Sequence, residues 1–497
     1  MAIVIGVDIG TTSTKVVAFD ESGQVQASAN QPYPLIQTQP DMAEEDPKQI
    51  YAAVMAGVHQ VIATVGGSQV AGISFSAAMH SVIVMDAQDQ PLTNVLTWAD
   101  NRGAAFAKRL KDTAQGRALV ARTGVPIHPM SPLVKLMWLN ATQPAVMAQA
   151  AHVIGIKDYV LFRWFGEYVQ DYSLANATGW FDLFELAYQP QALALAGLSA
   201  DQLPQLVDTN YQLRGMASTV AQQLGIAADT PVVIGASDGC LSNLGVGAAA
   251  PGTVAVTIGT SGAVRTVIDH PAVDASGRLF TYYLAKGRYV IGGPVNNGGV
   301  VWRWARDTIG AGQADDALTA LAKQVPAGAD GLLFLPYLGG ERAPLWDADA
   351  RGSFIGLTRQ HDTKAMLRAV LEGITMNLAT VLQQVSAVAG QPTLIHATGG
   401  FARSDLWRQL LADILNVPVA FPASFESSAL GAAIVGMQAL GLIQSLDEIV
   451  PKFNETLQPQ PSEAAVYGEL MPLWQDADRR LRTAYAQLAA FQRTHAN

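Results

Sequence analysis

Apolar and polar residues at the start of the chain are arranged as two strands joined by a turn. The apolar segment 3–7 leads into Asp8, and a second apolar segment covers residues 16–19. The intervening turn, residues 10–15, is polar and begins with Gly10. Apolar runs on either side of a polar turn predict a β-hairpin.

The composition of this turn favours an anionic ligand. Gly10 lets backbone N–H groups come close to a ligand, and the side chains that follow can donate hydrogen bonds or supply positive charge. These side chains are Thr11, Thr12, Ser13 and Lys15. Asp8 cannot bind phosphate itself, but a carboxylate at the end of a strand can hold Mg²⁺ against the phosphates of a nucleotide. A hairpin loop without a ligand is the alternative interpretation of the turn alone.

The same pattern returns 249 residues later. Thr257-Ile258-Gly259-Thr260-Ser261 aligns with residues 8–12, and apolar segments flank it at 254–256 and 264–268. A repeat at this distance predicts a duplicated domain, in which one turn from each half binds the same polyphosphate. Because Thr257 stands where the first copy has Asp8, we expect only the first copy to hold a metal ion.

Helical and strand patterns alternate in the rest of the first half. Asp46-Pro47 predicts a helix start, and apolar runs at 70–76 and 82–85 predict strands joined by a loop at 77–81. Loops at strand ends carry ligands in α/β folds, so His80 is a candidate for substrate contact. A loop histidine without a ligand is the alternative. Apolar residues at helical spacing follow the predicted helix start: Ile50, Val54, Val58, Val61 and Val65.

Two further segments of the first half carry candidate chemistry. Asp100 or Asn101 is expected to cap a helix, while the aromatic face of Trp98 and the guanidinium of Arg102 suit a polyhydroxylated acid; capping alone is the alternative. Farther along, an apolar strand runs through small residues to Asp238, which leaves a carboxylate where it could act as a base. Since Asp-Gly is also a common turn, the residues alone leave both interpretations open.

The second half contains two glycine pairs beside predicted helices. Gly298-Gly299 precedes a helix at 300–306, and Gly399-Gly400 ends a strand shortly before Ser404 opens another helix. After about residue 445 we expect a linker and then helices. The leucines expected to pack on the second domain are Leu470, Leu473, Leu481 and Leu488.

Length and composition narrow the class of protein. The 497 residues predict two domains of roughly 200 to 250 residues each. A net charge of −10 without a run of Lys or Arg argues against nucleic acid or an anionic membrane as partner. The single cysteine, Cys240, fits a reducing cytoplasm and is expected to be a small buried hydrophobe. No basic segment precedes the first apolar run, so no secretory signal is expected. The apolar stretch 429–443 is shorter than the ~20 residues of a membrane span and predicts a core helix.

Longer motifs resemble a known family. The paired Gly-Thr turns and Thr398-Gly399-Gly400-Phe401-Ala402-Arg403-Ser404 resemble the ATPase fold shared by actin, heat-shock chaperones and sugar kinases. Within that superfamily the chain resembles the FGGY carbohydrate kinases along nearly its whole length. Met130-x-Pro132-x-x-Lys135-Leu136-x-Trp138 fits one signature of that family. The other, between residues 352 and 372, fits only roughly because Ala365 stands where a polar residue is usual. Segments 74–81, 97–102 and 155–159 resemble the branch that phosphorylates gluconate.

The resemblance implies a fold and a set of site residues. The fold is α/β, with two duplicated actin-like (ribonuclease H-like) domains and the active site in the cleft between them. We expect a sugar- and metal-binding domain at 1–240, a nucleotide-binding domain at 241–445, and C-terminal helices at 446–497. Asp238 is implied to be the catalytic base and Asp8 the Mg²⁺ anchor. The implied sugar-binding residues are Met79, His80, Trp98, Asp100, Arg102 and Asp238. The implied nucleotide-binding residues are Thr11, Thr12, Ser13, Lys15, Gly259, Thr260, Gly298, Gly299, Gly399, Gly400 and Ser404.

The function implied is ATP- and Mg²⁺-dependent phosphorylation of a primary hydroxyl of a sugar acid, D-gluconate, in the cytoplasm. Arg102, or alternatively His80, is the candidate for binding the carboxylate of this substrate. A xylulose kinase or another sugar kinase of the family is the alternative, because the Met79-His80 pair also resembles the ketose branch. An ATP-driven binding switch of the actin or chaperone type is the alternative from another class. The expected partners are a small sugar acid and a nucleotide, with no nucleic acid and no membrane; a homodimer is left open.

Overall fold

The computed structural model describes residues 2–39, 41–274, 276–422 and 427–495. These residues form two compact units. Unit 1 comprises Met1–Ala249, Ile268–Ile291 and Glu426–Pro451, and unit 2 comprises Ala250–Val267, Gly292–Phe425 and Lys452–Asn497.

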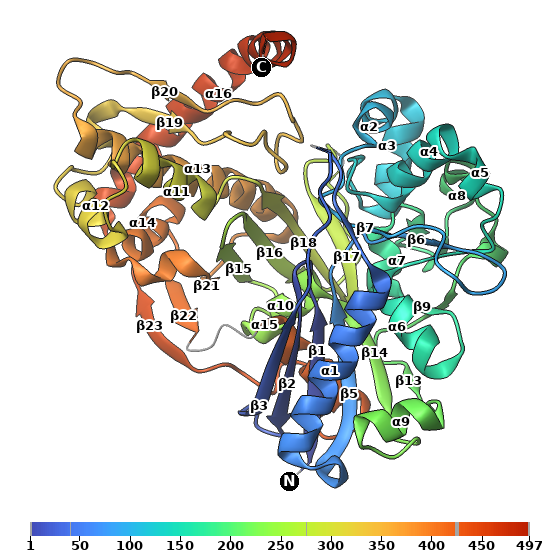
Figure 1. Cartoon of the computed structure of the whole chain (residues 1–497). Helices are drawn as coiled ribbons and strands as arrows, with labels where there is room; N and C mark the ends of the chain where they lie inside the picture. The colour runs from blue at the N-terminus through green and yellow to red at the C-terminus, as the bar shows by residue number, and fades with distance from the viewer. Residues whose placement is uncertain (1, 40, 275, 423–426, 496–497) are drawn as a thin grey trace. The chain divides into compact units, whose positions relative to one another are not determined.

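A six-stranded sheet forms the centre of unit 1, in the order β13-β14-β5-β1-β2-β3 (Figure 1). β1 and β2 pair antiparallel and form the predicted N-terminal hairpin. β5 lies parallel to β1 on one side and to β14 on the other. The strands are β1 (Ile3–Ile9), β2 (Ser13–Asp20), β3 (Val25–Pro32), β5 (Val70–Ala77), β13 (Gln212–Leu213) and β14 (Val232–Ser237).

Helices cover both faces of this sheet. Successive residues of β1 point to opposite faces, so Ile3, Ile5 and Val7 pack in a core shared with α1 (Pro47–Val65). Gly6 points the other way, toward α15 (Ser427–Ala439), where a Cβ atom would lie 2.1 Å from the carbonyl oxygen of Ala429. The α1 helix begins as predicted, with Asp46 accepting a hydrogen bond from the backbone N–H of Lys48.

The other elements of unit 1 are helices and short strands outside this sheet. A second apolar core joins several of the helices and contains Leu110, Leu119, Leu136 and Leu193. The helices are α2 (Ala104–Lys111), α3 (Ala114–Thr123), α4 (Pro132–Thr142), α5 (Pro144–Met147), α6 (Ile156–Phe165), α7 (Tyr172–Ala177), α8 (Pro190–Ala196), α9 (Ser218–Leu224) and α10 (Asp238–Gly245). The strands are β4 (Glu44–Glu45), β6 (Ile83–Met85), β7 (Val95–Leu96), β8 (His152–Ile154), β9 (Val169–Asp171), β10 (Phe181–Asp182), β11 (Ala187–Tyr188), β12 (Gln205–Val207) and β17 (Phe280–Ala285).

The sheet of unit 2 repeats the topology of the first. Its order is β17-β18-β16-β15-β21-β22-β23, although residues 268–291, with β17 and half of β18, group with unit 1. β15 and β16 form an antiparallel hairpin, and β15, β21 and β22 run parallel, as β1, β5 and β14 do. The register is also the same, because Asp8 pairs with Ser76 in one sheet and Thr257 with Thr398 in the other. The predicted duplication is therefore confirmed.

The remaining elements complete unit 2. The strands are β15 (Thr253–Ile258), β16 (Gly262–Ile268), β18 (Arg288–Val295), β19 (Leu333–Leu335), β20 (Ser353–Ile355), β21 (Leu394–Thr398), β22 (Val419–Pro422) and β23 (Phe453–Leu457). The helices are α11 (Gly299–Thr308), α12 (Asp315–Ala322), α13 (Thr363–Ala389), α14 (Asp405–Leu415) and α16 (Pro461–His495).

We expected a single domain boundary near residue 240. Each unit instead consists of three separate segments of the chain. The α15 helix belongs to unit 1, although we assigned its residues to the second domain. Close packing of small residues explains this, because a Cβ on Gly431 would lie 2.0 Å from the carbonyl oxygen of Leu241 in α10. The sequence shows a helix of small residues at this position but does not show which sheet the helix covers.

Of the four leucines that we expected to pack on the second domain, Leu470 and Leu481 are half-buried in α16. Leu473 and Leu488 are exposed, at 62 % and 52 %. Larger aromatic residues take the buried positions of α16, among them Tyr467, Trp474 and Tyr485. The leucine-based prediction was wrong for these two residues because aromatic side chains bury more area in the same helix.

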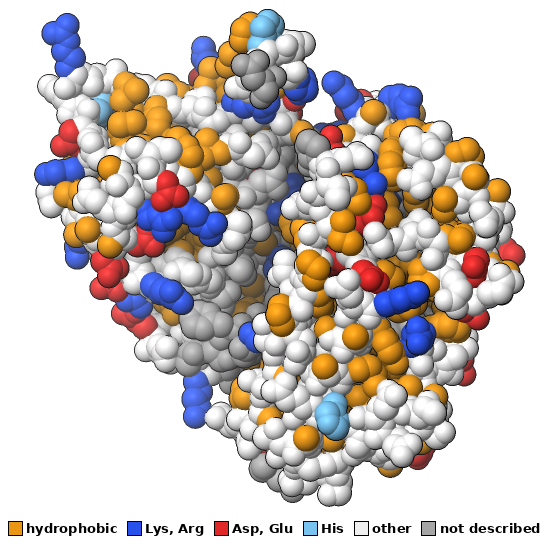
Figure 2. Space-filling view, viewed as in Figure 1, with side chains coloured by type: hydrophobic (Ala, Val, Ile, Leu, Met, Phe, Trp, Pro, Cys, Tyr) orange, Lys and Arg blue, Asp and Glu red, His pale blue; other side chains and the backbone are white. Residues whose placement is uncertain are grey.

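Two apolar helices resemble membrane spans in composition. By length and hydropathy alone α13 could cross a membrane, but 89 % of its apolar window is buried inside the protein. The shorter α15 is buried along most of its length, as predicted for a core helix. The side chain of Cys240 is buried, as we predicted for this cysteine. On the face drawn in Figure 2, acidic and basic side chains of the described residues are interspersed.

Candidate active site

The carboxyl ends of three parallel strands meet at one edge of the unit 1 sheet. Asp8 on β1 lies opposite Ser76 on β5, and Ser76 lies opposite Ala236 on β14. With about 4.8 Å between neighbouring strands, the strand ends that carry Asp8 and Asp238 are about 10 Å apart. Ligands in open α/β folds bind at such an edge.

Asp8 is held in a fixed orientation at this edge. The hydroxyl of Ser76 donates a hydrogen bond of 2.7 Å to Asp8 Oδ1, and the carboxylate is only half-buried. In unit 2 the equivalent pair consists of two hydroxyls, Thr257 and Thr398, which are 3.3 Å apart. The carboxylate is thus confined to the first copy, as the sequence predicts.

The first Gly-Thr turn is supported from two sides. Its backbone is closed by a hydrogen bond from Gly10 N–H to the carbonyl of Ser13, and the Tyr33 hydroxyl donates to the carbonyl of Gly10 at 2.6 Å. The indole N–H of Trp98 donates to the Thr11 hydroxyl at 2.9 Å. The structure therefore brings Trp98 to the first Gly-Thr turn, a contact that sequence spacing does not reveal.

The second turn lies in unit 2 against the glycine pair at the start of α11. Gly299 N–H donates to the carbonyl of Gly259 at 2.7 Å, and Val300 N–H donates to the carbonyl of Thr260 at 3.1 Å. A Cβ on Gly298 would lie 2.5 Å from the carbonyl oxygen of Ser261. These glycines thus allow the second Gly-Thr turn and the start of α11 to touch.

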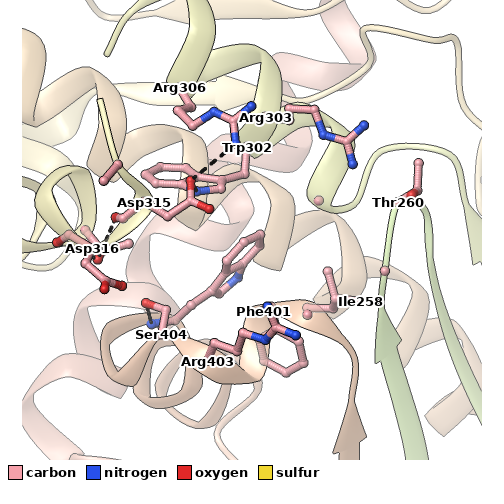
Figure 3. A pocket seen from close by; sticks show the side chains of 16 residues that line it. Ile258, Thr260, Trp302, Arg303, Arg306, Asp315, Asp316, Phe401, Arg403 and Ser404 are labelled. Carbon is pink, nitrogen blue, oxygen red and sulfur yellow. Dashed lines mark hydrogen bonds and ion pairs between the residues drawn. The ribbon is translucent and has the colours of Figure 1, made fainter. Parts of the chain in front are cut away.

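A pocket of about 640 Å³ opens beside this turn in unit 2 (Figure 3). The walls include the aromatic rings of Trp302, Phe401 and Trp407, and Ser404 caps α14 by accepting a hydrogen bond from Trp407 N–H. Arg303 lies on the side of the pocket nearest Thr260 (Figure 3).

The two glycines at 399 and 400 have different roles in this pocket. Gly399 has a positive φ of 119°, and a Cβ there would lie 2.1 Å from the carbonyl oxygen of Ile258, so it serves close packing. A Cβ on Gly400 would meet no atom within 4 Å, and Gly400 lines the pocket. Gly400 therefore leaves room for a flat ligand.

Several residues of this pocket were missed by sequence reasoning. Trp302 Nε1 donates to Asp315 Oδ1 at 3.1 Å, and Arg306 lies 4.0 Å from the same carboxylate. These residues come from α11 and α12, and no short motif joins them. The missed residues are Trp302, Arg303, Arg306, Asp315, Asp316 and Trp407, whereas Phe401 and Arg403 lie in the motif 398–404 that resembles the ATPase fold.

Asp238 is the first residue of α10, directly after β14. Its side chain is half-buried, and Oδ1 accepts a hydrogen bond of 2.7 Å from Gly239 N–H. The residue before it is anchored, because the Ser173 hydroxyl accepts from Ser237 N–H at 3.2 Å and lies 2.9 Å from the Ser237 hydroxyl. A buried ion pair between Lys157 and Asp171, 2.7 Å long, supports the same region. The backbone that carries the Asp238 carboxylate is therefore held in place by its neighbours.

His80 is fixed at both ring nitrogens. Nδ1 lies 2.7 Å from the carbonyl oxygen of Ala177, and Nε2 lies 3.2 Å from the hydroxyl of Tyr282. Since a carbonyl can only accept, Nδ1 carries a proton. The backbone of His80 is in the left-handed region, with φ 66°. This conformation sets the direction of the loop that contains Met79.

Arg102 is held by two carboxylates of its own unit. Its guanidinium donates to Asp100 Oδ2 at 2.9 Å and to Glu44 Oε1 at 2.5 Å, and it stacks on Trp138 at 4.4 Å. This pairing occupies the guanidinium, and it does not support Arg102 as the anchor of a substrate carboxylate.

Asp100 has a supporting position in place of the sugar contact that we expected. It is fully buried and accepts hydrogen bonds from Ala43 N–H and Arg102 N–H. The predicted cap was also wrong, because α2 begins at Ala104 with Gly103 as its N-cap residue.

Glu45 follows Glu44 in β4, and its carboxyl group is buried. The effect of this burial on the stability of the fold can be tested. Burial raises the pKa of the Glu45 carboxyl to about 8. A raised pKa in the folded state means that the protonated form stabilises the fold below the unfolded pKa of 4.5, and that this stability is lost as pH rises through about 8. We expect Glu45→Gln to match the wild type in thermal unfolding at pH 5 and to be more stable at pH 8.5, by on the order of 2–4 kcal/mol.

The exposed Glu167 offers a matched control for this measurement. Glu167→Gln should leave the difference between pH 5 and pH 8.5 unchanged. An equal gain for Glu45→Gln at both pH values would show that burial does not perturb this carboxyl.

Comparisons with known proteins cover nearly the whole chain. The N-terminal domain of the FGGY family of carbohydrate kinases matches residues 3–245, and the C-terminal domain of that family matches residues 254–440. A gluconokinase of Bacillus subtilis (strain 168) is 46 % identical, over 98 % of this chain and 98 % of the relative. Two solved structures from Lactobacillus acidophilus are each 41 % identical over 98 % of this chain. One is a gluconate kinase (99 % of that chain, TM-score 0.95) and the other a ligand-bound xylulose kinase (100 % of that chain, TM-score 0.96). Because the matches extend through both halves of the duplicated fold, the chain belongs to the FGGY family of carbohydrate kinases.

Proposed function

We propose that this protein transfers the γ-phosphoryl group of ATP to the primary hydroxyl of D-gluconate and releases 6-phospho-D-gluconate and ADP. The observation that carries the proposal is the 46 % identity to a gluconokinase along the full length of both chains. Phosphorylation of xylulose is the second candidate, because a xylulose kinase is among the structures of 41 % identity.

The nucleotide fits the unit 2 pocket. Adenine is flat and apolar on its faces, which matches the open side of Gly400 and the rings of Trp302 and Phe401. Phosphates suit the Gly259-Thr260 turn, which the first N–H groups of α11 hold in place. In unit 1, the first turn also suits phosphate, because it offers the hydroxyls and the positive charge of Thr11, Thr12, Ser13 and Lys15.

The residues at the end of β1 fit Mg²⁺. Among the described residues no group of three or more His, Cys, Asp or Glu side chains could hold a metal ion. Mg²⁺ in kinases is commonly bound by one or two carboxylates together with phosphate oxygens and water, so Asp8, oriented by Ser76, suffices. When bound, the ion would neutralise charge on the phosphates.

The sugar fits beside Asp238 at the carboxyl edge of the unit 1 sheet. A sugar hydroxyl is too weak an acid to ionise at neutral pH, so Asp238 accepts its proton as the oxygen attacks the γ-phosphorus in line. The bond from the γ-phosphorus to the bridging oxygen breaks, and ADP leaves with that oxygen. Met79, His80 and Trp98 are the proposed sugar contacts, and the cytoplasm is the proposed location.

An assay of ADP release against a panel of substrates tests this proposal. We expect the highest kcat/KM with D-gluconate, and much lower values with xylulose, ribulose and glycerol. Preference for xylulose would replace the proposed substrate with the second candidate. ATP hydrolysis that no sugar accelerates would support an ATP-driven binding switch.

A further inference from the structure

We infer that Lys135 is a positioning residue that holds the two proposed sugar-binding segments of unit 1, residues 77–81 and 96–98, through their backbone carbonyls. The inference rests on the proposed function, because the segments concerned are the proposed sugar contacts. Lys135 belongs to the motif Met130 to Trp138, for which the mechanism above has no use. Its side chain is 0 % exposed, so it acts through other residues.

The ammonium group of Lys135 connects three segments of the chain. Nζ donates to the carbonyl of His80 at 2.6 Å and lies 3.4 Å from the carbonyl of Leu96. His80 belongs to the loop after β5, whereas Leu96 ends β7 and leads into Trp98. One buried group on α4 therefore holds the bases of the two segments that carry Met79, His80 and Trp98.

The hydrogen bond to His80 acts at a strained position. A non-glycine residue in the left-handed region costs free energy unless its surroundings hold it there, and His80 has φ 66°. The bond from Lys135 fixes the carbonyl of this residue, while Ala177 and Tyr282 fix its ring. Without Lys135, the ring would keep its partners but the backbone would lose the contact that sets its direction.

Trp138 extends the same support one turn along α4. Residues three apart lie on one side of a helix, and the Trp138 ring stacks under the Arg102 guanidinium at 4.4 Å. Arg102 in turn holds Asp100, which accepts from Arg102 N–H. The two motif residues thus support the loop of residues 77–81 and the segment of residues 98–102 together.

Lys135 donates hydrogen bonds in either protonation state. Burial lowers the pKa of Lys135 to about 7, with Asp100 favouring the charged form and Arg102 opposing it. Both the ammonium and the amine carry N–H groups. The positioning contact therefore does not require a particular charge.

Steady-state kinetics of Lys135→Met on the full chain test this role. Methionine keeps the length and the apolar stem but cannot donate. We expect KM for D-gluconate to rise about tenfold, as for loss of a hydrogen bond that leaves a buried carbonyl without its donor, while KM for ATP changes by less than about twofold. Lys135→Gln keeps an N–H donor on a shorter side chain. Its KM for the sugar should lie between those of the wild type and of Lys135→Met.

Two controls separate positioning from stability. Lys108→Met makes the same change at an exposed site on α2 and should leave both KM values unchanged. Leu136→Ala removes a fully buried side chain next to Lys135 and should lower Tm without changing KM for the sugar. If Lys135→Met does not fold, Lys135→Gln is compared with Leu136→Ala alone.

Three outcomes would overturn the inference. They are an unchanged KM for the sugar in a folded Lys135 variant, equal increases for sugar and ATP, or a rise in sugar KM for Leu136→Ala as large as for the Lys135 variant. Failure of the proposed function appears separately, as a wild type that does not use D-gluconate; the variants are then compared on the substrate that the panel identifies.

Discussion

Asp238→Asn is expected to lower kcat by about 10²- to 10⁴-fold, the range that general base catalysis supplies. Asparagine has the shape of aspartate but cannot accept a proton from the attacking hydroxyl. Its side-chain oxygen can still accept the hydrogen bond that Gly239 N–H gives to Asp238, so the start of α10 should keep its structure. KM for ATP should barely change, because the pocket proposed for the nucleotide is lined by residues of unit 2.

The exposed Asp229 provides the matched control, since Asp229→Asn makes the same change on the same unit. Its kcat should equal that of the wild type. Near-normal turnover of Asp238→Asn on the preferred sugar would remove Asp238 from the mechanism. A pre-steady-state measurement of ADP formation should place the loss in the chemical step, not in product release.

The local elements of the site could be predicted from the sequence. These elements depend on residues close together in the chain, where spacing and turn chemistry determine the structure. They are the two Gly-Thr hairpins, the helix cap at Asp46 and the strand leading to Asp238. The alignment of residues 8–12 with 257–261 also predicted the shared topology. The common register of the two sheets confirms it.

The partners of charged and aromatic side chains could not be predicted in this way. Glu44 lies 58 residues from Arg102 in the chain, yet it occupies the guanidinium that we expected to bind substrate. Trp302 and Trp407 meet in the unit 2 pocket only after α11 and α14 pack. Such contacts depend on the tertiary arrangement, and a single sequence gives no measure of it.

Lys135 is a residue that the sequence identifies but whose role the sequence does not show. The sequence marks Lys135 as part of a family motif, and a lysine is usually exposed. Only the structure shows that it is buried and that it binds the carbonyl of His80. Motif matching therefore identified the residue, but packing was needed to assign it a role.

Asp8→Asn is expected to lower kcat by about 10²- to 10³-fold, the cost of removing one electrostatic stabiliser of the transition state. The amide oxygen of asparagine can still accept the hydrogen bond from Ser76, so the end of β1 should be preserved. Loss of the negative charge weakens the site for Mg²⁺. We therefore also expect half-maximal activity to require a higher Mg²⁺ concentration than in the wild type.

Two further measurements assign this loss to the metal site. Calorimetry without nucleotide should show unchanged binding of D-gluconate to Asp8→Asn, because Asp8 acts on the phosphates and not on the sugar. Ser76→Ala, which keeps the carboxylate but removes its hydrogen bond, should cost only about tenfold in kcat, as expected for loss of an orienting contact. If Asp8→Asn lost sugar binding while its Mg²⁺ dependence stayed normal, Asp8 would belong to the sugar site, and the metal anchor would have to be sought among other residues at the carboxyl edge of β1, β5 and β14.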